Sequence, residues 1–267
     1  MLAPKSFYIT LPSNVKSHGH QKNLTSEYTT LLPKPLQLSR DNWEISLVEI
    51  AYPYSWNNIT EPYNTIKFRY YQPKNDTYVS VIQKVEESYY KSLEDLVAAI
   101  NTIKPEGFRG NLAFEKKGRK IKIVLFQKEE IKFHDRLAQL LGFTENTFNY
   151  SSPEMTEDEP DRIRIKATFH GDIRALHYNI YVYSNIIEPR LVGTRYLPLL
   201  RTINVDASEG SYVSKVYTYP QFLNLSSDYI ESIEIKITDD TGENLAFTWG
   251  KVIVTLLFRQ KSFLHYR

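Results

Sequence analysis

Two residues in the stretch FHGDI have the types and spacing of an acid–base pair. His170 could act as a general base, with Asp172 as the carboxylate that orients its ring. Gly171 between them is instead typical of a turn at the end of a strand, where an aspartate side chain accepts an Asx hydrogen bond. We therefore interpret the pair as a turn and not as a catalytic dyad.

Two adjacent carboxylates, Asp239 and Asp240, are a second candidate for acid–base work. They stand directly before Thr241-Gly242 and between two expected strands. Aspartate followed closely by glycine is typical of a hairpin turn, because the side chain bonds to the turn backbone and glycine tolerates a positive φ. The sequence predicts a structural role for both carboxylates.

Cofactor and metal signatures are missing from the chain. Its 10 glycines form no phosphate loop or dinucleotide fingerprint, and neither a G-x-S-x-G elbow nor an H-E-x-x-H helix occurs. His18 and His20 could share a metal ion, but two ligands in a polar loop do not make a zinc site. Six scattered histidines also argue against a metal-dependent enzyme on a jelly-roll scaffold, and the absence of cysteine excludes thiolate chemistry. We expect no catalytic residue, no cofactor, no metal and no enzyme activity.

Composition sets the class of protein. The chain has 267 residues, enough for a core without disulfides, and a net charge of +2, too small to indicate nucleic-acid binding by itself. It contains no apolar run of 18 residues and no secretion signal, so we expect an intracellular or assembly-compartment protein without a membrane-spanning segment. The 20 tyrosines are typical either of a β surface or of a contact surface, and composition leaves both open.

Period-two alternation of apolar residues, typical of strands in a sandwich or barrel, occurs on both sides of a helical region. Before residue 90 it occurs in SFYITLP, NWEISLVEI, TIKFRYY and YVSVIQKV; after residue 161 it occurs in IRIKATF, YNIYVYS, LLRTINVD, YVSKVYTY, ESIEIKI and GKVIVTLLFR. The fold class we predict from this pattern is mainly β, an antiparallel sandwich or barrel.

The period changes to that of a helix at residue 92. SLEDLVAAINTI places leucine, valine and isoleucine on one helical stripe, with Ser92 as the N-cap. A hairpin with its turn at Lys117-Gly118 follows, and then a short helix, HDRLAQLLGF, with Gly142 after its end. We predict an inserted small α+β subdomain, helix–hairpin–helix, within 91–150. The N-terminal strands of the β fold would then occupy 1–90, and its remaining strands 151–267.

The closing strands of the chain are well specified. Ile233, Ile235 and Ile237 are expected to line the core, followed by a turn at Asp240–Gly242, and then by Phe247 and Trp249, which continue inward. The final strand carries apolar residues on both faces. This suits a strand between its own core and another layer, such as a neighbouring subunit.

The segment YSNIIEPRLVGTRY is the candidate subunit interface. It combines turn residues with apolar side chains that something must cover, and arginine and tyrosine are common interface anchors. The alternative is a loop folded back on its own sandwich. The candidate interface residues are Ile186, Ile187, Arg190, Leu191, Val192, Arg195 and Tyr196.

Six segments occur in order along nearly the whole chain: FYITLPSN, YTTLLPKPLQLSRDNWEISLVEIAYPYSW, YYKSLEDLVAAIN, LAQLLGF, YNIYVYSNIIEPRLVGTRYLPLLR and IESIEIKITDDTGENLAFTWGKVIVTLLFRQ. Together these segments resemble the penton, or minor capsid, proteins of Polinton/Maverick elements, adintoviruses and virophage-like viruses.

The resemblance implies a single jelly-roll antiparallel β-sandwich, in which two four-stranded sheets pack face to face, with the small α+β subdomain inserted into it. It also implies a homopentamer at each five-fold vertex of an icosahedral shell, next to a double-jelly-roll major capsid protein. The location would be the virion, after assembly inside the host cell. A host receptor bound through the insertion is a further candidate partner, and the basic end FRQKSFLHYR leaves nucleic-acid contact open. The alternative function is a jelly-roll binding module for receptor or carbohydrate attachment, without catalytic activity.

Overall fold

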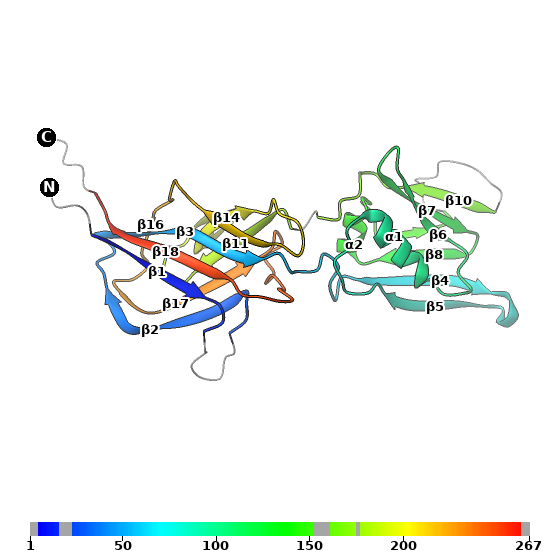
Figure 1. Ribbon diagram of the computed structural model, residues 1–267. Coiled ribbons are helices and arrows are strands. Elements are labelled where there is room, and N and C mark those ends of the chain that lie inside the picture. Colours follow the sequence, from blue (N-terminus) through cyan, green and yellow to red (C-terminus); the bar gives the residue numbers. More distant parts are fainter. Residues whose placement is uncertain (1–4, 16–22, 152–160, 175–176, 263–267) are drawn as a thin grey trace. The chain divides into compact units, whose positions relative to one another are not determined.

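The computed structural model describes residues 5–15, 23–151, 161–174 and 177–262 of the chain. The chain divides into two compact units (Figure 1). The first joins Met1–Trp56 to Leu176–Arg267, and the second is the intervening segment Asn57–Ala175. None of the helices in the described residues is long and apolar enough to cross a membrane.

The first unit contains two large antiparallel sheets and, in addition, one two-stranded sheet that is described below. One of the large sheets has the strand order β1-β18-β3-β15, and β16 also pairs with β3. The other has the order β14-β11-β17-β2. Their strands are β1 (Ser6–Pro12), β2 (Glu27–Gln37), β3 (Trp43–Pro53), β11 (Asn179–Ser184), β14 (Leu199–Asn204), β15 (Tyr212–Val216), β16 (Leu223–Asn224), β17 (Tyr229–Thr238) and β18 (Ile253–Gln260).

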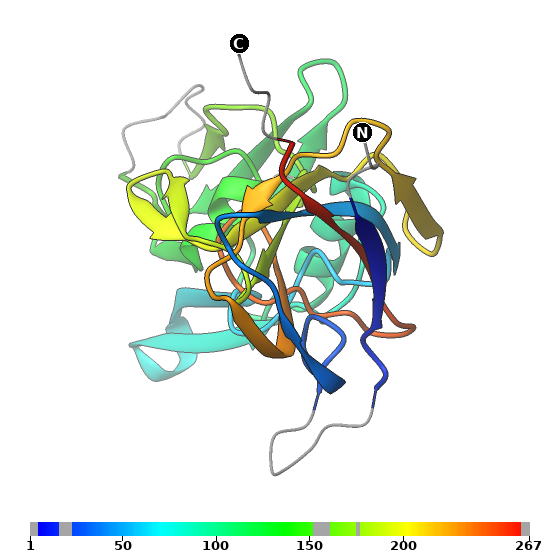
Figure 2. The ribbon, with the colours of Figure 1, turned by 90° about the vertical axis from the view of Figure 1, so that its left-hand side faces the viewer.

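This strand order is that of a jelly roll. The first strand pairs with the last, β1 with β18; the second pairs with the second last, β2 with β17; and the series continues with β3 and β15, then with β11 and β14. Such nested pairing arises when one long antiparallel ribbon wraps around a core. Figure 2 shows the two chain-terminal strands side by side, β1 in dark blue and β18 in red. The predicted fold class is confirmed.

Alternating side chains of the two sheets form the core between them. Ile233, Ile235 and Ile237 of β17 are fully buried, as predicted. From the other sheet, Val254, Leu256 and Phe258 of β18 are also fully buried. Burying each such side chain contributes about 1.5–3 kcal/mol relative to leaving it exposed, so these two strands hold the sheets together.

The connection between β17 and β18 is partly as predicted. Gly242, with φ +86°, belongs to a turn in which its N–H bonds to the Asp239 carbonyl at 3.1 Å. Phe247 packs edge-on against the buried Trp56, with ring centroids 5.6 Å apart. Trp249 was predicted to point inward, but it is 47% exposed. It lies in irregular backbone before β18, where the strand period no longer sets its direction.

The second unit also contains two antiparallel sheets, ordered β5-β4-β8-β9 and β10-β7-β6, with two α-helices. Its elements are β4 (Thr65–Gln72), the 3-10 turn η1 (Pro73–Asn75), β5 (Thr77–Lys84), α1 (Leu93–Thr102), β6 (Asn111–Glu115), β7 (Lys120–Phe126), β8 (Glu129–Phe133), α2 (Asp135–Leu140), β9 (Thr147–Asn149) and β10 (Arg162–Lys166).

The predicted helices and hairpin of this unit are present. The Ser92 hydroxyl accepts a hydrogen bond from the Asp95 N–H at 3.1 Å and caps α1. Gly142, with φ +88°, follows the C-cap residue Leu141 of α2, in the left-handed conformation that glycine tolerates best. Strands β6 and β7 form the predicted hairpin.

The boundaries of the insertion differ from those predicted. Strands β4 and β5 were assigned to the jelly roll, but β4 pairs with β8, inside the second unit. Strand β10 was assigned to the jelly roll too, and it pairs with β7. The insertion therefore runs from Asn57 to Ala175 instead of over 91–150, and it enters the jelly roll between β3 and β11. Period-two alternation identifies a strand but carries no information about which sheet it joins.

A buried carboxylate fixes one turn of the inserted unit. Glu129, 5% exposed, accepts hydrogen bonds from the N–H groups of Arg109 at 2.6 Å, Gly110 at 3.1 Å and Phe126 at 2.9 Å. Burying a charge without such partners would cost several kcal/mol. Three backbone donors thus satisfy the charge and connect β8 to the segments before β6 and at the end of β7.

Candidate assembly surface

The two adjacent carboxylates of the sequence form structural hydrogen bonds. Asp239 Oδ1 accepts the N–H of Thr241 at 2.8 Å and that of Glu243 at 3.2 Å, so it holds the turn after β17. Asp240 Oδ2 accepts the N–H groups of Tyr178 and Asn179, both at 3.1 Å, at the start of β11. The pair therefore closes a turn and connects it to the neighbouring strand, as the turn interpretation requires.

Asp240 also affects a tyrosine. The Tyr181 hydroxyl donates to Asp240 Oδ1 at 3.3 Å. Burial raises the pKa of Tyr181, and the negative charge of Asp240 raises it further. Both effects keep the phenol protonated, so it acts as a hydrogen-bond donor and not as a base.

The other acid–base candidate is also a turn. Asp172 Oδ1 accepts the N–H of Arg174 at 3.0 Å, which is the predicted Asx hydrogen bond. His170 is exposed. His18 and His20 lie outside the described residues. Within the described ranges, no group of three or more histidines and carboxylates is arranged to hold a metal ion.

The candidate interface divides into a buried and an exposed part. Ile186 is 3% exposed and Ile187 1% exposed. The Ile186 carbonyl accepts the Ser226 N–H at 3.0 Å, and Ile187 forms an isolated bridge to Leu225. These two isoleucines therefore pack on their own sandwich. Their burial favours the alternative considered from the sequence, a loop folded back on its own sandwich.

The remaining candidates form a small hairpin that the sequence did not reveal. Strand β12 (Arg190–Val192) pairs with β13 (Arg195–Leu197) through a two-residue turn, Gly193-Thr194, with φ +60° at the glycine. The opposed pair Leu191 and Tyr196 is 63% and 73% exposed. Residues 190–197 are called the assembly hairpin below. In the sequence, the glycine between two short apolar runs, Gly193, is the feature that could have indicated this hairpin.

An open cavity of about 440 Å³ lies beside this hairpin in the first unit. Arg195 and Leu197 of β13 line it, together with Tyr183 of β11 and with Glu234 and Lys236 of β17. Its lining thus includes aromatic, aliphatic and charged groups of both signs. Tyrosine and arginine, which line it here, are residue types enriched at protein interfaces.

The sheet β1-β18-β3-β15 has a second exposed surface. The sequence indicated it only through the apolar residues on both faces of β18. Its inward positions are buried, so the alternate positions of β1, β18, β3 and β15 face outward. Tyr8 is 66% exposed, Tyr212 51% and Val216 68%. We call this surface the outer face; it consists of Tyr8, Thr10, Tyr212, Val216, Ile253, Thr255 and Leu257.

Charge is sparse among the outward positions of these four strands. The charged residues at these positions include Glu49 and, near one end of the sheet, Glu44 and Arg259, whose side chains form an ion pair at 2.7 Å. A sheet surface with so few charges and such exposed apolar side chains is typical of an interaction site.

The fold and these surfaces define the class: a single-jelly-roll protein with an inserted α+β unit. No protein-family model matches the chain, and no curated protein matches its sequence. Among solved structures it is similar to the mavirus penton protein, with 13% identity and a TM-score of 0.49 over 96% of this chain and 100% of that one. It is also similar to a chain of the Sputnik virophage, with 14% identity and a TM-score of 0.45 over 97% and 98%.

Proposed function

We propose that the protein is a structural protein of an icosahedral viral capsid, and that it acts by self-assembly as the pentameric capsomer, or penton, at the vertex. The observation that carries the proposal is the exposure of aromatic and aliphatic side chains at two separate places on the jelly roll, the assembly hairpin and the outer face. The segments that resemble penton proteins support the same function. The candidate catalytic carboxylates, by contrast, form turns.

A closed ring needs two different surfaces on each subunit. In a cyclic pentamer every contact is heterologous, because one patch of a subunit meets another patch of its neighbour. The assembly hairpin supplies a protruding patch with Leu191 and Tyr196 as anchors. The outer face supplies a flat patch on the other sheet. We assign these as the two halves of the contact.

The proposal includes two partners. The first, which follows from this assignment, is another copy of the chain. The second is a double-jelly-roll major capsid protein around the vertex, which the sequence resemblance implies. The protein would then reside in the virion.

A jelly-roll binding module is the second candidate function. It is favoured by a cavity of about 420 Å³ on the inserted unit, within the 300–1,000 Å³ range of small-ligand sites. This function would need no ring. A penton with a ligand-binding insertion would combine the two functions.

The test is electron microscopy of the purified protein with class averaging. Five-fold rings are expected for the wild type. Leu191→Asp combined with Tyr196→Asp should leave a folded monomer, because both side chains are exposed in the subunit. Phe169→Asp, which changes a 62% exposed aromatic residue of the inserted unit, is the control and should retain rings.

Two results would overturn parts of the proposal. A wild-type protein that sedimented as a monomer at every concentration would overturn self-assembly. Rings that persisted in the double variant would remove the assembly hairpin from the contact.

A further inference from the structure

Three rows of side chains cross the outward face of the sheet β5-β4-β8 in the inserted unit. The middle row is Ile82, Lys67 and Lys132, in which Lys67 is paired in register with both of the others. Two lysines thus stand directly opposite each other on adjacent strands, with Cβ atoms about 5 Å apart. Like charges in this arrangement destabilise a sheet.

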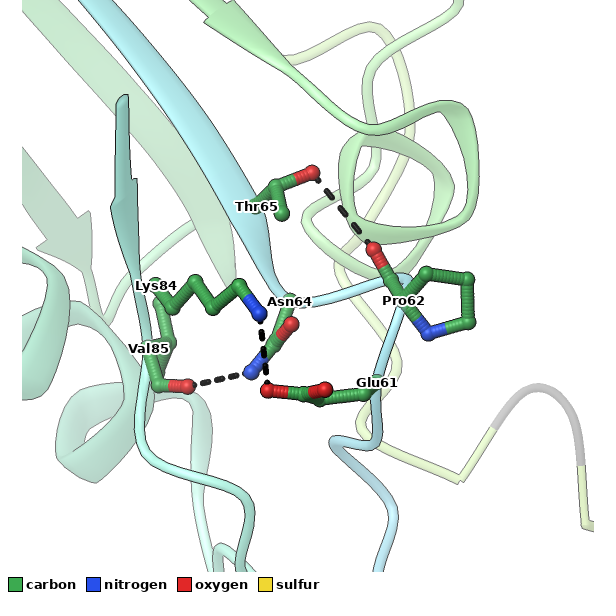
Figure 3. A network of polar contacts seen from close by, with 6 residues as sticks. All are labelled: Glu61, Pro62, Asn64, Thr65, Lys84 and Val85. Carbon is green, nitrogen blue, oxygen red and sulfur yellow. Dashed lines mark hydrogen bonds and ion pairs between the residues drawn. The ribbon is translucent and has the colours of Figure 1, made fainter. Parts of the chain in front are cut away.

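In each of the two neighbouring rows, a basic side chain is paired with an acidic one. In one, Arg69 lies opposite Glu130, with side chains 3.9 Å apart. In the other, the Lys84 ammonium bonds to Glu61 at 2.9 Å (Figure 3). Figure 3 also shows the Asn64 amide bonded to the Val85 carbonyl, which fixes the backbone at this edge of the sheet. No such acid reaches Lys67 or Lys132 within the part of the chain that the structure describes.

The unpaired lysines line the cavity of about 420 Å³. The other lining residues are Thr65, Ile82, Phe133, His134, Asp135 and Asn146. Asp135 is the one acid among them, and it accepts a hydrogen bond from the Asn146 amide. With His134 neutral, the lining carries a net charge of +1, from two lysines and one aspartate.

The rest of the lining is suited to a ligand with hydroxyl groups. His134 Nδ1 accepts the Arg136 N–H at 3.3 Å, so in the neutral ring the proton is on Nε2, which is then a donor. The Thr65 hydroxyl donates to the Pro62 carbonyl at 3.5 Å (Figure 3), so its oxygen is left as an acceptor, and the Asn146 amide keeps a second N–H beside the one bonded to Asp135. Ile82, 67% exposed, supplies an apolar wall.

We propose that this cavity binds an acidic saccharide, of one or two sugar units, whose carboxylate or sulfate lies between Lys67 and Lys132. An anion there relieves the repulsion between the two ammonium groups and forms charge-assisted hydrogen bonds with both. The size of the cavity and its two lysines, which pair with no acid among the described residues, fit one small anion better than a polyphosphate chain. The inference concerns the inserted unit alone and holds whether or not the chain forms a ring.

The test is titration of the full chain, followed by NMR of its backbone and side-chain amides. The two probes are the methyl glycoside of N-acetylneuraminic acid, which carries a carboxylate, and a sulfated heparin disaccharide. Binding of either should shift the amide signals of Lys132 and Asn146. The probe that binds more tightly identifies the source of the anion.

The variant is Lys67→Ser with Lys132→Ser, in which binding should weaken at least tenfold. Lys74→Ser with Lys84→Ser is the matched control, since it removes two exposed lysines of the same unit from outside the cavity. The Lys67/Lys132 variant should also keep or gain thermal stability, because it removes a like-charge pair. That measurement separates lost binding from lost folding.

Three results would overturn the proposal: no shift with either probe at millimolar concentration, equal binding by the wild type and the Lys67/Lys132 variant, or equal weakening in the Lys74/Lys84 control. Displacement of the sugar by an equal concentration of inorganic sulfate would also overturn it, because the site would then recognise an anion without its sugar.

Discussion

The hydroxyl group of Tyr28 donates a hydrogen bond to the carbonyl oxygen of Leu11 at 3.0 Å, across the interior of the jelly roll. Tyr28 belongs to β2 in one sheet and Leu11 to β1 in the other, and each is 1% exposed. The two sheets are therefore joined by a polar contact as well as by apolar packing. Burial raises the pKa of Tyr28 well above that of a free tyrosine.

Replacing Tyr28 with phenylalanine should lower the free energy of unfolding by about 1–2 kcal/mol at neutral pH, because the Leu11 carbonyl loses its donor. The wild type should also lose stability as the pH rises above about 10, since the unfolded chain ionises this tyrosine before the folded one does. The raised folded pKa makes the neutral form the stabilising one, so the contribution is complete below pH 10. Urea denaturation between pH 7 and pH 11 measures both effects.

The control for this prediction is Tyr8→Phe, which changes an exposed tyrosine on β1. It should leave the free energy of unfolding at neutral pH unchanged. If Tyr28→Phe retained the full alkaline slope of the wild type, other groups would be responsible for it.

Replacing Glu129 with glutamine should destabilise the inserted unit by about 2–4 kcal/mol. The carboxylate accepts N–H groups on both oxygens, and the amide nitrogen of glutamine would face one set of these donors without accepting from it. Hydrogen exchange at Arg109, Gly110 and Phe126 should accelerate strongly. Glu130→Gln changes a neighbouring, more exposed carboxylate and should have little effect. Slow exchange at the three amides in the Glu129 variant would contradict the prediction.

Excision of residues 57–175 should leave a folded jelly roll. The rings of Trp56 and His177, which flank the insertion, are 6.3 Å apart between centroids, so a short glycine linker can join the chain ends. Excision of 91–143 alone should cause aggregation, because β4 would lose its partner β8 and expose an open edge. Circular dichroism and sedimentation of both shortened chains test this. A folded product from the shorter excision would show that β4 and β5 do not need the rest of the unit.

The candidate surface was only partly predictable. Leu191 and Tyr196 were selected from composition and turn residues, and both are exposed. Ile186 and Ile187 were selected by the same reasoning, and both are buried. Local sequence indicates that an apolar side chain must be buried. It does not show whether the residues that bury it belong to the same chain or to a partner. The apolar residues on both sides of β18 predicted one part of the outer face. Its residues on β1 and β15 could not be predicted in the same way, because they join the surface only through strand pairing.

The sequence alone determined the local elements: the alternation that buries Ile233, Ile235 and Ile237, the Ser92 cap of α1 and the aspartate turns. Each depends on residues a few positions apart, so its physical cause lies within the segment itself. Only the tertiary structure decided that residues 65–84 and 162–166 leave the jelly roll for the inserted unit, and that Lys67 and Lys132 meet beside a cavity. These features depend on ladders between residues distant in the chain, whose register is set by the whole sheet and not by either strand.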